Sequence, residues 1–331
     1  MRIILKVYLI SFFTLVCLAI NAQPKFSEIS SYPGSFSRMG FGARGISMGN
    51  SIGAVIEGNL STYYNPALSA FQDNNYLQVG YSFLSLDRSL NYLSFTRNFK
   101  FSSKNDNKVR SAGVSAGIIN AGISKIDARD NQGNKTGDLS TSENQFYIAL
   151  ANRFSEKFAI GINLKLYYYH LYENVNSTTF AFDIGALYVF NENITAALVI
   201  TDINGKYKWD TTDLYGQDGN NEENKFPLLK KLALAYNFKE PQIIVSAEIE
   251  NSNANSNIFR FGAEYGIYPG LKIRTGIDKI NLSNSDIPAR PSFGFSYEYS
   301  FESWVVGVDY AYAYEPYSIN NSHILSINFN L

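Results

Sequence analysis

The sequence is short of the residues that several protein classes require. Its one cysteine, Cys17, lies in an apolar N-terminal run, so the rest of the chain has no thiol for a disulfide framework or a thiolate metal site. Only 17% of the 331 residues are charged, against roughly 25% in an average soluble protein. Basic and acidic groups nearly balance, at 28 against 29, which excludes the strongly basic surface of a nucleic-acid-binding protein.

Long hydrophobic runs are also missing, apart from one at the N-terminus. Residues 1–22 have the pattern of a secretory signal peptide, because Arg2 and Lys6 precede a mostly apolar run over 7–20 and Ala22 offers a small residue for cleavage. An uncleaved N-terminal anchor is the alternative. No later stretch reaches about 18 consecutive apolar residues, so the sequence excludes a helical membrane protein.

What the chain has in abundance is alternation of apolar and polar residues with a period of two, together with 24 Tyr and 24 Phe. The pattern predicts fourteen strands, most of about 10–12 residues, a length that lets a tilted strand cross a bilayer. The predicted strands span 76–85, 90–99, 109–120, 143–154, 157–170, 179–190, 193–201, 228–239, 241–250, 256–266, 269–279, 291–300, 303–313 and 321–331.

The expected connections alternate between tight turns and longer loops near 121–142, 171–178, 202–227, 251–255, 280–290 and 314–320. Short periplasmic turns and longer external loops are typical of outer-membrane barrels. We therefore predict an all-β protein with a 14-stranded antiparallel transmembrane β-barrel over 76–331, in contact with outer-membrane lipid and with both termini in the periplasm. A soluble β-sandwich or a lipocalin-like barrel is the alternative.

If the apolar faces meet lipid, the other strand faces line the lumen. The residues on those inward faces include many charged side chains, which we call the charge lattice. We expect these charges to be paired with one another, because charges in a confined space need partners. The central members of the lattice are Lys165, Arg260, Glu264, Arg274, Asp278, Glu298 and Asp309. Glycines of the same parity leave room for an inserted plug, and a plugged lumen is favoured over an open polar conduit. These glycines are Gly161, Gly185, Gly262, Gly276, Gly294 and Gly307.

Residues 23–75, which we call the plug segment, are the candidate for that plug. The segment precedes the first strand, is rich in glycine and other small residues, and shows no strand alternation. Gly40, Gly42 and Gly45 match a dinucleotide-binding spacing, but no strand precedes them, so tight turns and close packing explain them better. Asn65-Pro66 is a turn or helix-start signal.

At these residues the chain resembles the PorV/PorQ family, within the wider group of barrels like the fatty-acid transporter FadL. The resemblance lies in Arg44-Gly-Ile-Ser-Met-Gly49, in Tyr64-Asn65-Pro66-Ala67-Leu68, and near the end in Val308-Asp-Tyr-Ala311 and His323-Ile-Leu-Ser326. It covers essentially the whole chain after residue 22. It implies a Gram-negative, Bacteroidota-like outer membrane and an N-terminal hatch that holds Arg44, Gly49, Asn65, Pro66 and Ala67.

The resemblance also implies two functions. A PorV/PorQ-like barrel serves type IX protein secretion as a non-catalytic adaptor that holds secretion-system or surface-attachment proteins. A FadL-like barrel instead carries a hydrophobic ligand past its hatch. The hatch region is shorter than in typical transporters of that group and no long apolar external loop is present, which favours the adaptor.

Catalytic and metal sites are not expected. The only imidazoles, His170 and His323, fall on the lipid-facing parity, where a base has no access to luminal partners. The acidic loops lack the spacing of a calcium loop, so no cofactor or metal is predicted. Tyr207, Trp209 and Tyr215 make the 202–227 loop the expected external contact surface.

Overall fold

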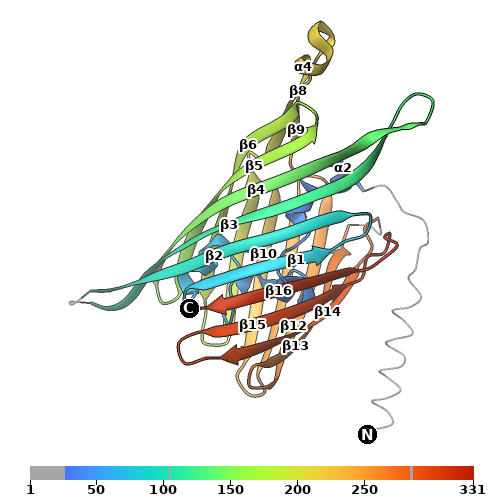
Figure 1. Ribbon diagram of the computed structural model, residues 1–331. Coiled ribbons are helices and arrows are strands. Elements are labelled where there is room, and N and C mark those ends of the chain that lie inside the picture. The colour runs from blue at the N-terminus through green and yellow to red at the C-terminus, as the bar shows by residue number, and fades with distance from the viewer. Residues whose placement is uncertain (1–26, 104–105, 284–285) are drawn as a thin grey trace, which may run out of the picture.

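A computed structural model describes residues 27–103, 106–283 and 286–331, with the side chains of 102–109 left aside. The predicted signal peptide, residues 1–22, therefore lies outside the described residues. Fourteen strands of the described chain close into one antiparallel barrel, in which β1 pairs with β16 and every other barrel strand pairs with its neighbour in sequence (Figure 1). The predicted all-β, 14-stranded barrel is thus confirmed. No helix of the described part is long and apolar enough to cross a membrane.

The strands are long because period-two alternation runs through each of them. The barrel strands are β1 (Tyr76–Phe83), β2 (Arg88–Ser103), β3 (Asp106–Arg129), β4 (Lys135–Ser155), β5 (Phe158–Tyr172), β6 (Val175–Val189), β7 (Ile194–Ile203), β10 (Leu229–Phe238), β11 (Ile243–Ser252), β12 (Ser256–Tyr268), β13 (Leu271–Asn281), β14 (Arg290–Ser300), β15 (Val305–Ala313) and β16 (Ser322–Asn330). All fourteen predicted strands overlap these elements.

One end of the barrel, which we call the turn end, carries the tight turns and the C-terminus. The opposite loop end differs from the sequence prediction in three places. The expected loops near 121–142 and 171–178 are largely strand, since β3 and β4 run on as a long hairpin and β5 nearly meets β6. The 202–227 loop forms a separate two-stranded sheet, β8 (Lys206–Asp210) and β9 (Asn221–Lys225), with α4 (Thr212–Tyr215) and η4 (Gly216–Asp218) at its tip (Figure 1).

The plug segment packs against the inner wall as short helices joined by turns. These are α2 (Glu28–Ser31), η1 (Ser35–Arg38), α3 (Ala43–Ser47), η2 (Ile52–Ala54) and η3 (Pro66–Phe71). Contacts of α3 with β13–β16, of η2 with β7, β10 and β11, and of η3 with β2–β6 join the segment to most of the wall. Nearly every residue from 40 to 70 is buried, so this segment fills the lumen.

The two ends of the described chain lie at opposite ends of the barrel. The Leu331 amide donates to the Asn75 carbonyl, which places the C-terminus beside the start of β1 at the turn end. The Asn255 side chain, in the loop between β11 and β12, donates to Glu28 at 2.6 Å, which places the first described residues at the loop end. The expectation that both termini share the periplasmic turn end is therefore wrong for the described chain, because the plug segment crosses the lumen.

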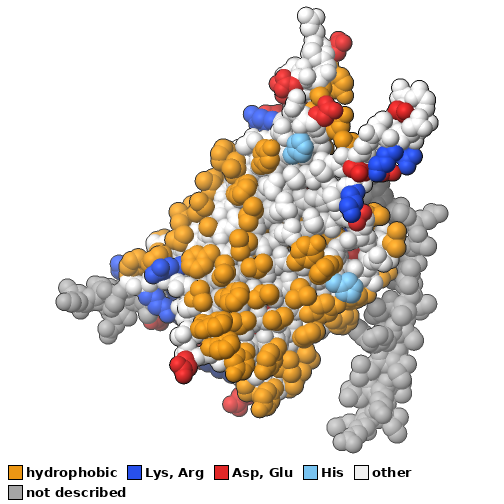
Figure 2. All heavy atoms as spheres, in the orientation of Figure 1, with side chains coloured by type: hydrophobic (Ala, Val, Ile, Leu, Met, Phe, Trp, Pro, Cys, Tyr) orange, Lys and Arg blue, Asp and Glu red, His pale blue; other side chains and the backbone are white. Residues whose placement is uncertain are grey.

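The outer face of the barrel carries an apolar belt. Outward side chains such as Ile148, Phe180 and Leu232 are each more than half exposed, at 53%, 58% and 59%. On the face shown in Figure 2, hydrophobic side chains form a broad orange band over the lower strands. Exposed apolar surface on this scale is not stable against water and indicates a lipid environment.

Candidate functional site

The candidate site is the contact between the plug segment and the barrel wall. Five plug residues were predicted to matter there, and the structure buries all of them: Arg44, Gly49, Asn65, Pro66 and Ala67. Asn65 begins η3, where its side chain accepts a hydrogen bond from the Ala67 amide at 3.0 Å and donates to the Gly53 carbonyl at 3.0 Å. Pro66 follows at the first helical position, where its missing N–H costs nothing. Gly49 has a φ of 60°, a conformation that suits glycine.

Inward glycines of the wall form the surface that receives these turns. A Cβ at Gly185 would lie 2.1 Å from the Asn65 Oδ1, and a Cβ at Gly161 would lie 2.5 Å from the Ala67 nitrogen. On the opposite side, a Cβ at Gly276 would lie 2.2 Å from the Gly49 nitrogen. Gly262 and Gly294 meet the same stretch of the plug, at Met48 and Ser47. Gly307 is the exception among the predicted glycines, because its nearest neighbour is the side chain of a wall residue.

Arg44 joins the plug to the wall through a buried ion-pair cluster. Its guanidinium meets Glu264 in a bidentate pair at 2.9 and 3.0 Å and also donates to two plug carbonyls at 2.8 Å, those of Glu57 and Asn59. Arg274 bridges Glu264 at 2.6 Å and Asp309 at 2.7 Å. Charge-assisted bidentate pairs are among the strong hydrogen bonds of proteins, so this cluster is an anchor for the plug.

A second cluster surrounds Arg260. It pairs with Glu248 and Glu250 at 3.1 Å and with Asp278 at 2.7 Å. The plug contributes Asn50, whose side-chain amide donates to Asp278 at 3.0 Å.

The remaining lattice residues lie apart from these clusters. Lys165 pairs with Asp183 at 2.8 Å and with Asp202 at 2.9 Å. Glu298 pairs with Lys272 at 3.1 Å in a half-buried position near the turn end. Every one of the seven predicted lattice residues therefore has an ionic partner, although they form several clusters and not a single lattice.

Sequence reasoning missed some members of these clusters. Asp202 was assigned to an external loop, but its φ of 61° and the register shift between β6 and β7 turn it inward to Lys165. Glu315 was likewise placed in a loop and instead pairs with Arg290 at the edge of the lumen. The inward turn of Asp202 depends on a local backbone irregularity that a period-two pattern does not show, and Glu315 lies in a loop outside that pattern.

Tyr64 holds the middle of the plug together. Its hydroxyl donates to the Asn50 side chain at 2.7 Å and lies where a Cβ at Gly45 would be, only 2.1 Å away. Burial raises the pKa of Tyr64 well above its ordinary value, so the hydroxyl stays protonated and remains a donor. The glycines at 40, 42 and 45 thus serve tight turns and this close approach.

The opposite part of the lumen is lined by aromatic side chains. A buried cluster joins Phe36 and Phe41 of the plug to Tyr92, Tyr147 and Tyr167 of the wall. Within it, Phe41 stacks on Tyr92 with ring centroids 5.7 Å apart, and the hydroxyls of Tyr92 and Tyr147 lie 3.1 Å apart.

The hairpin of β8 and β9, which we call the external hairpin after the predicted 202–227 external loop, closes this aromatic cluster at the loop end. Phe226 packs on Tyr167 with centroids 4.9 Å apart and on the backbone of Gly34. Tyr207 is 2% exposed and donates to Glu143, so its predicted role as an exposed contact residue is wrong. Trp209 is half-buried and donates to Asn224, whereas Tyr215 at the tip is 64% exposed and fits that role.

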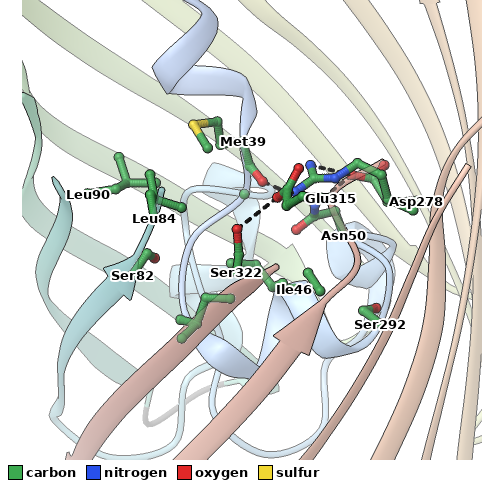
Figure 3. A pocket seen from close by; sticks show the side chains of 14 residues that line it. Met39, Ile46, Asn50, Ser82, Leu84, Leu90, Asp278, Ser292, Glu315 and Ser322 are labelled. Carbon is green, nitrogen blue, oxygen red and sulfur yellow. Dashed lines mark hydrogen bonds and ion pairs between the residues drawn. The ribbon is translucent and has the colours of Figure 1, made fainter. Parts of the chain in front are cut away.

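A small cavity lies where the plug, the aromatic cluster and the charged clusters meet. Apolar side chains of Met39, Leu84 and Leu90 form one side, and Asn50, Asp278 and Glu315 approach from the other, with Ile46 below them (Figure 3). About 20 Å³ of it is open to the centre of a water molecule, which is room for about one water. A hydrocarbon therefore does not fit in this cavity in this conformation, and a larger molecule enters it only if the plug moves.

The two histidines lie outside this site. His170 meets the Asn176 side chain at 2.8 Å and His323 meets the Tyr310 hydroxyl at 2.7 Å, both on the outward faces of their strands. Neither imidazole reaches the lumen.

No protein-family model matches the sequence, and no curated protein sequence matches it. Solved structures do share the fold. The Pseudomonas putida toluene transporter TodX superposes with a TM-score of 0.56 at 14% identity, over 88% of this chain and 96% of that chain. The Ralstonia pickettii toluene transporter TbuX gives 0.57 at 13% identity, over 88% and 97%. A Pseudomonas aeruginosa FadL homologue gives 0.55 at 11% identity, over 87% and 97%. The chain thus has the fold of FadL-like barrels.

Proposed function

We propose that the protein lies in the outer membrane and passes small hydrophobic molecules through its lumen, past the plug segment. The observation that carries the proposal is the continuous apolar lining beside the plug. Met39, Leu84 and Leu90 belong to the cavity of Figure 3 and also pack in or against the aromatic cluster. An apolar solute moving along these side chains gives up no hydrogen bonds, and burial of its surface is favourable.

Two further observations support this proposal over the adaptor. The apolar belt fits lipid around the barrel, with the turn end periplasmic and the loop end external, as in barrels with short periplasmic turns. The solved structures that share the fold include two toluene transporters and CymD, a monoaromatic hydrocarbon channel. A substrate of that size class, a monoaromatic or similarly small hydrocarbon, suits a lumen with a narrow apolar lining.

A disulfide between the plug and the wall tests whether the plug must move. A Cβ on Gly53 of η2 would lie 3.6 Å from the Ala233 Cβ on β10, within the range that disulfides adopt. The Gly53→Cys/Ala233→Cys variant would carry the only two thiols after residue 22. We expect oxidation to stop uptake of radiolabelled toluene by Gram-negative cells that express the variant, and reduction to restore it.

The control variant is Ala128→Cys/Gly137→Cys. Its two positions are partners across the β3–β4 hairpin, away from the plug, so its disulfide would not tie the plug to the wall. Oxidation of this pair should leave uptake unchanged. Equal uptake by the oxidised Gly53–Ala233 disulfide and the reduced protein would show that the plug does not gate passage.

The PorV/PorQ-like adaptor in type IX secretion is the second candidate. The external hairpin favours it, because β8, β9 and α4 rise beyond the barrel and present Tyr215 (Figure 1). A photocrosslinker at position 215 in native outer membranes should then capture a secretion-system or surface-attachment protein. Capture of none, with the hydrocarbon uptake above intact, would eliminate the adaptor.

A further inference from the structure

The outer surface of β2–β4, above the apolar belt, is polar and uncharged. Asn91 donates to Asn120 at 3.1 Å, and Asn120 donates to Asn144 at 2.8 Å, so three amides form a ladder across three paired strands. These residues share the outward parity of Phe95 and Ile148 and lie nearer the loop end. Figure 2 shows this area as a broad face without charged side chains between the orange belt and the charged hairpin tip.

A groove of about 550 Å³ opens beside the ladder. It exists because β3 and β4 run on past the short tip of the β1–β2 hairpin and form a wall above it. Its lining includes Ser89, Asn120, Ser140 and Ser142 on one side and Tyr81 and Phe83 on the other. The two rings contact each other edge to face, with centroids 4.6 Å apart, and are 43% and 52% exposed.

This combination of groups matches the chemistry of a sugar. Serine hydroxyls and asparagine amides both donate and accept, as the hydroxyls of a saccharide require. Exposed aromatic rings pack against the apolar C–H faces of a sugar ring. Among the lining residues only Asp87 and Arg88 are charged, and their charges oppose each other, so the groove does not favour a phosphate or another ion.

We propose that this groove binds the saccharide headgroup of an outer-leaflet glycolipid. Its place supports that occupant, because the groove adjoins the loop-end edge of the apolar belt, where the acyl chains of such a lipid would lie against Phe83 and Phe95. The inference rests on the proposed external orientation of the loop end but does not depend on the transported molecule. Through this groove, strands β1–β4 would hold the barrel against the headgroups of the outer leaflet.

The test compares two outward amide ladders. The groove variant Asn120→Leu/Ser142→Leu removes two hydrogen-bonding side chains from the lining. The matched control Asn251→Leu/Asn257→Leu changes a second ladder on β11 and β12, where Asn251 donates to Asn257 at 2.8 Å outside the groove lining. Leucine suits the outer face of a barrel in both places, and heat-dependent electrophoretic mobility checks that each barrel has folded.

Native mass spectrometry of the full chain in nanodiscs measures the binding of digalactosyldiacylglycerol, an uncharged glycolipid, with phosphatidylglycerol as the sugar-free lipid. We expect the wild type and the control to retain the glycolipid, and the groove variant to bind it about tenfold more weakly, the effect of two lost hydrogen bonds. Phe83→Ala should weaken it as well. Equal retention by the groove variant, or equal binding of phosphatidylglycerol by the wild type, would overturn the proposal.

The same variants separate this inference from the transport proposal. Hydrocarbon uptake by the groove variant should equal that of the wild type, since the groove lies outside the lumen. If the protein transports no hydrocarbon at all, the lipid measurement still decides whether the groove binds a saccharide.

Discussion

The two walls of the lumen hold the same plug in different ways. The charged wall, β11–β15, supplies eight of the buried charged side chains of the described residues, and it holds Arg44 and Asn50 through ionic and charge-assisted contacts. The neutral wall, β1–β4, supplies none of them within the described chain. It holds the plug through bonds between uncharged groups, such as the 2.9 Å bond from Thr62 to Ser115 and the 2.8 Å bond from Ser111 to the Ala70 carbonyl.

This difference indicates from which wall the plug separates when a solute passes. A neutral hydrogen bond contributes about 0.5–1.5 kcal/mol net, whereas removing one partner of a buried ion pair costs about 3–5 kcal/mol. The aromatic cluster also lines the neutral side, so an apolar solute finds both the weaker contacts and the apolar surface there. We infer that the charged wall anchors the plug and that the neutral wall forms the path.

The largest expected effect comes from Glu264→Gln. It leaves the buried guanidiniums of Arg44 and Arg274 without their shared carboxylate, which should cost the docked plug about 3–5 kcal/mol. We expect ion conductance in planar bilayers and faster proteolysis within residues 27–75. The control is Lys272→Met, which breaks a pair whose lysine is 26% exposed and should cost about 0–1 kcal/mol. If the Glu264→Gln barrel conducted no more than the wild type, the ion pair between Arg44 and Glu264 would not anchor the plug.

Gly276→Ala should have the next largest effect. Its Cβ would lie 2.2 Å from the Gly49 nitrogen, a backbone atom of the plug, so the plug must shift at a cost of about 1–3 kcal/mol. Proteolysis of the plug in folded protein measures the shift. Gly137→Ala, where no atom lies within 4 Å, is the control and should match the wild type. Unchanged protection in Gly276→Ala would mean that the plug is not seated on this wall.

Asn65→Ala should weaken the start of η3 by about 1 kcal/mol, because it removes the acceptor for the Ala67 amide and the donor to Gly53. Asn65→Ser keeps an uncharged acceptor for the Ala67 amide and loses the amide donor to Gly53, so its conductance should lie between those of the wild type and Asn65→Ala. Conductance that rises in the order wild type, Ser, Ala checks the prediction. Serine behaving as poorly as alanine would instead assign the main role to the Gly53 bond.

The smallest effect is expected on the neutral wall. Tyr92→Phe removes the 3.1 Å contact with the Tyr147 hydroxyl and the 3.3 Å contact with Ser61 of the plug, but it keeps the apolar ring that packs on Phe41. We expect no added conductance and an unchanged rate of toluene uptake. A large leak from this variant would show that the neutral wall carries as much of the seal as the charged wall does.

The sequence was informative about the barrel because each strand repeats its own local signal. Residues 158–168 alternate without a break, and so do 325–331, which is enough to place a strand and its two faces. Inward charges such as Arg260 and Arg274 followed from the same parity. The inward glycines predicted room for a plug, and five of the six meet it.

Other features depend on contacts between distant residues. The inward turn of Asp202 comes from a register shift between β6 and β7, and the burial of Tyr207 comes from Phe226 folding back over Tyr167. The position of Glu28 at the loop end depends on the whole path of the plug through the lumen. No local period encodes these arrangements, so sequence reasoning assigned Asp202 and Tyr207 to an exposed loop and the first described residues, near Glu28, to the wrong end.

The most direct test of the central claim locates a hydrophobic probe in the lumen. A diazirine-bearing monoaromatic hydrocarbon is added to the protein in outer-membrane vesicles, irradiated, and mapped by peptide mass spectrometry. We predict luminal labels on the neutral wall and its aromatic cluster, at Tyr92, Ile119 and Tyr147, and none near Arg260 or Arg274. Labelling of the charged wall, or labels confined to the outer belt, would contradict this prediction.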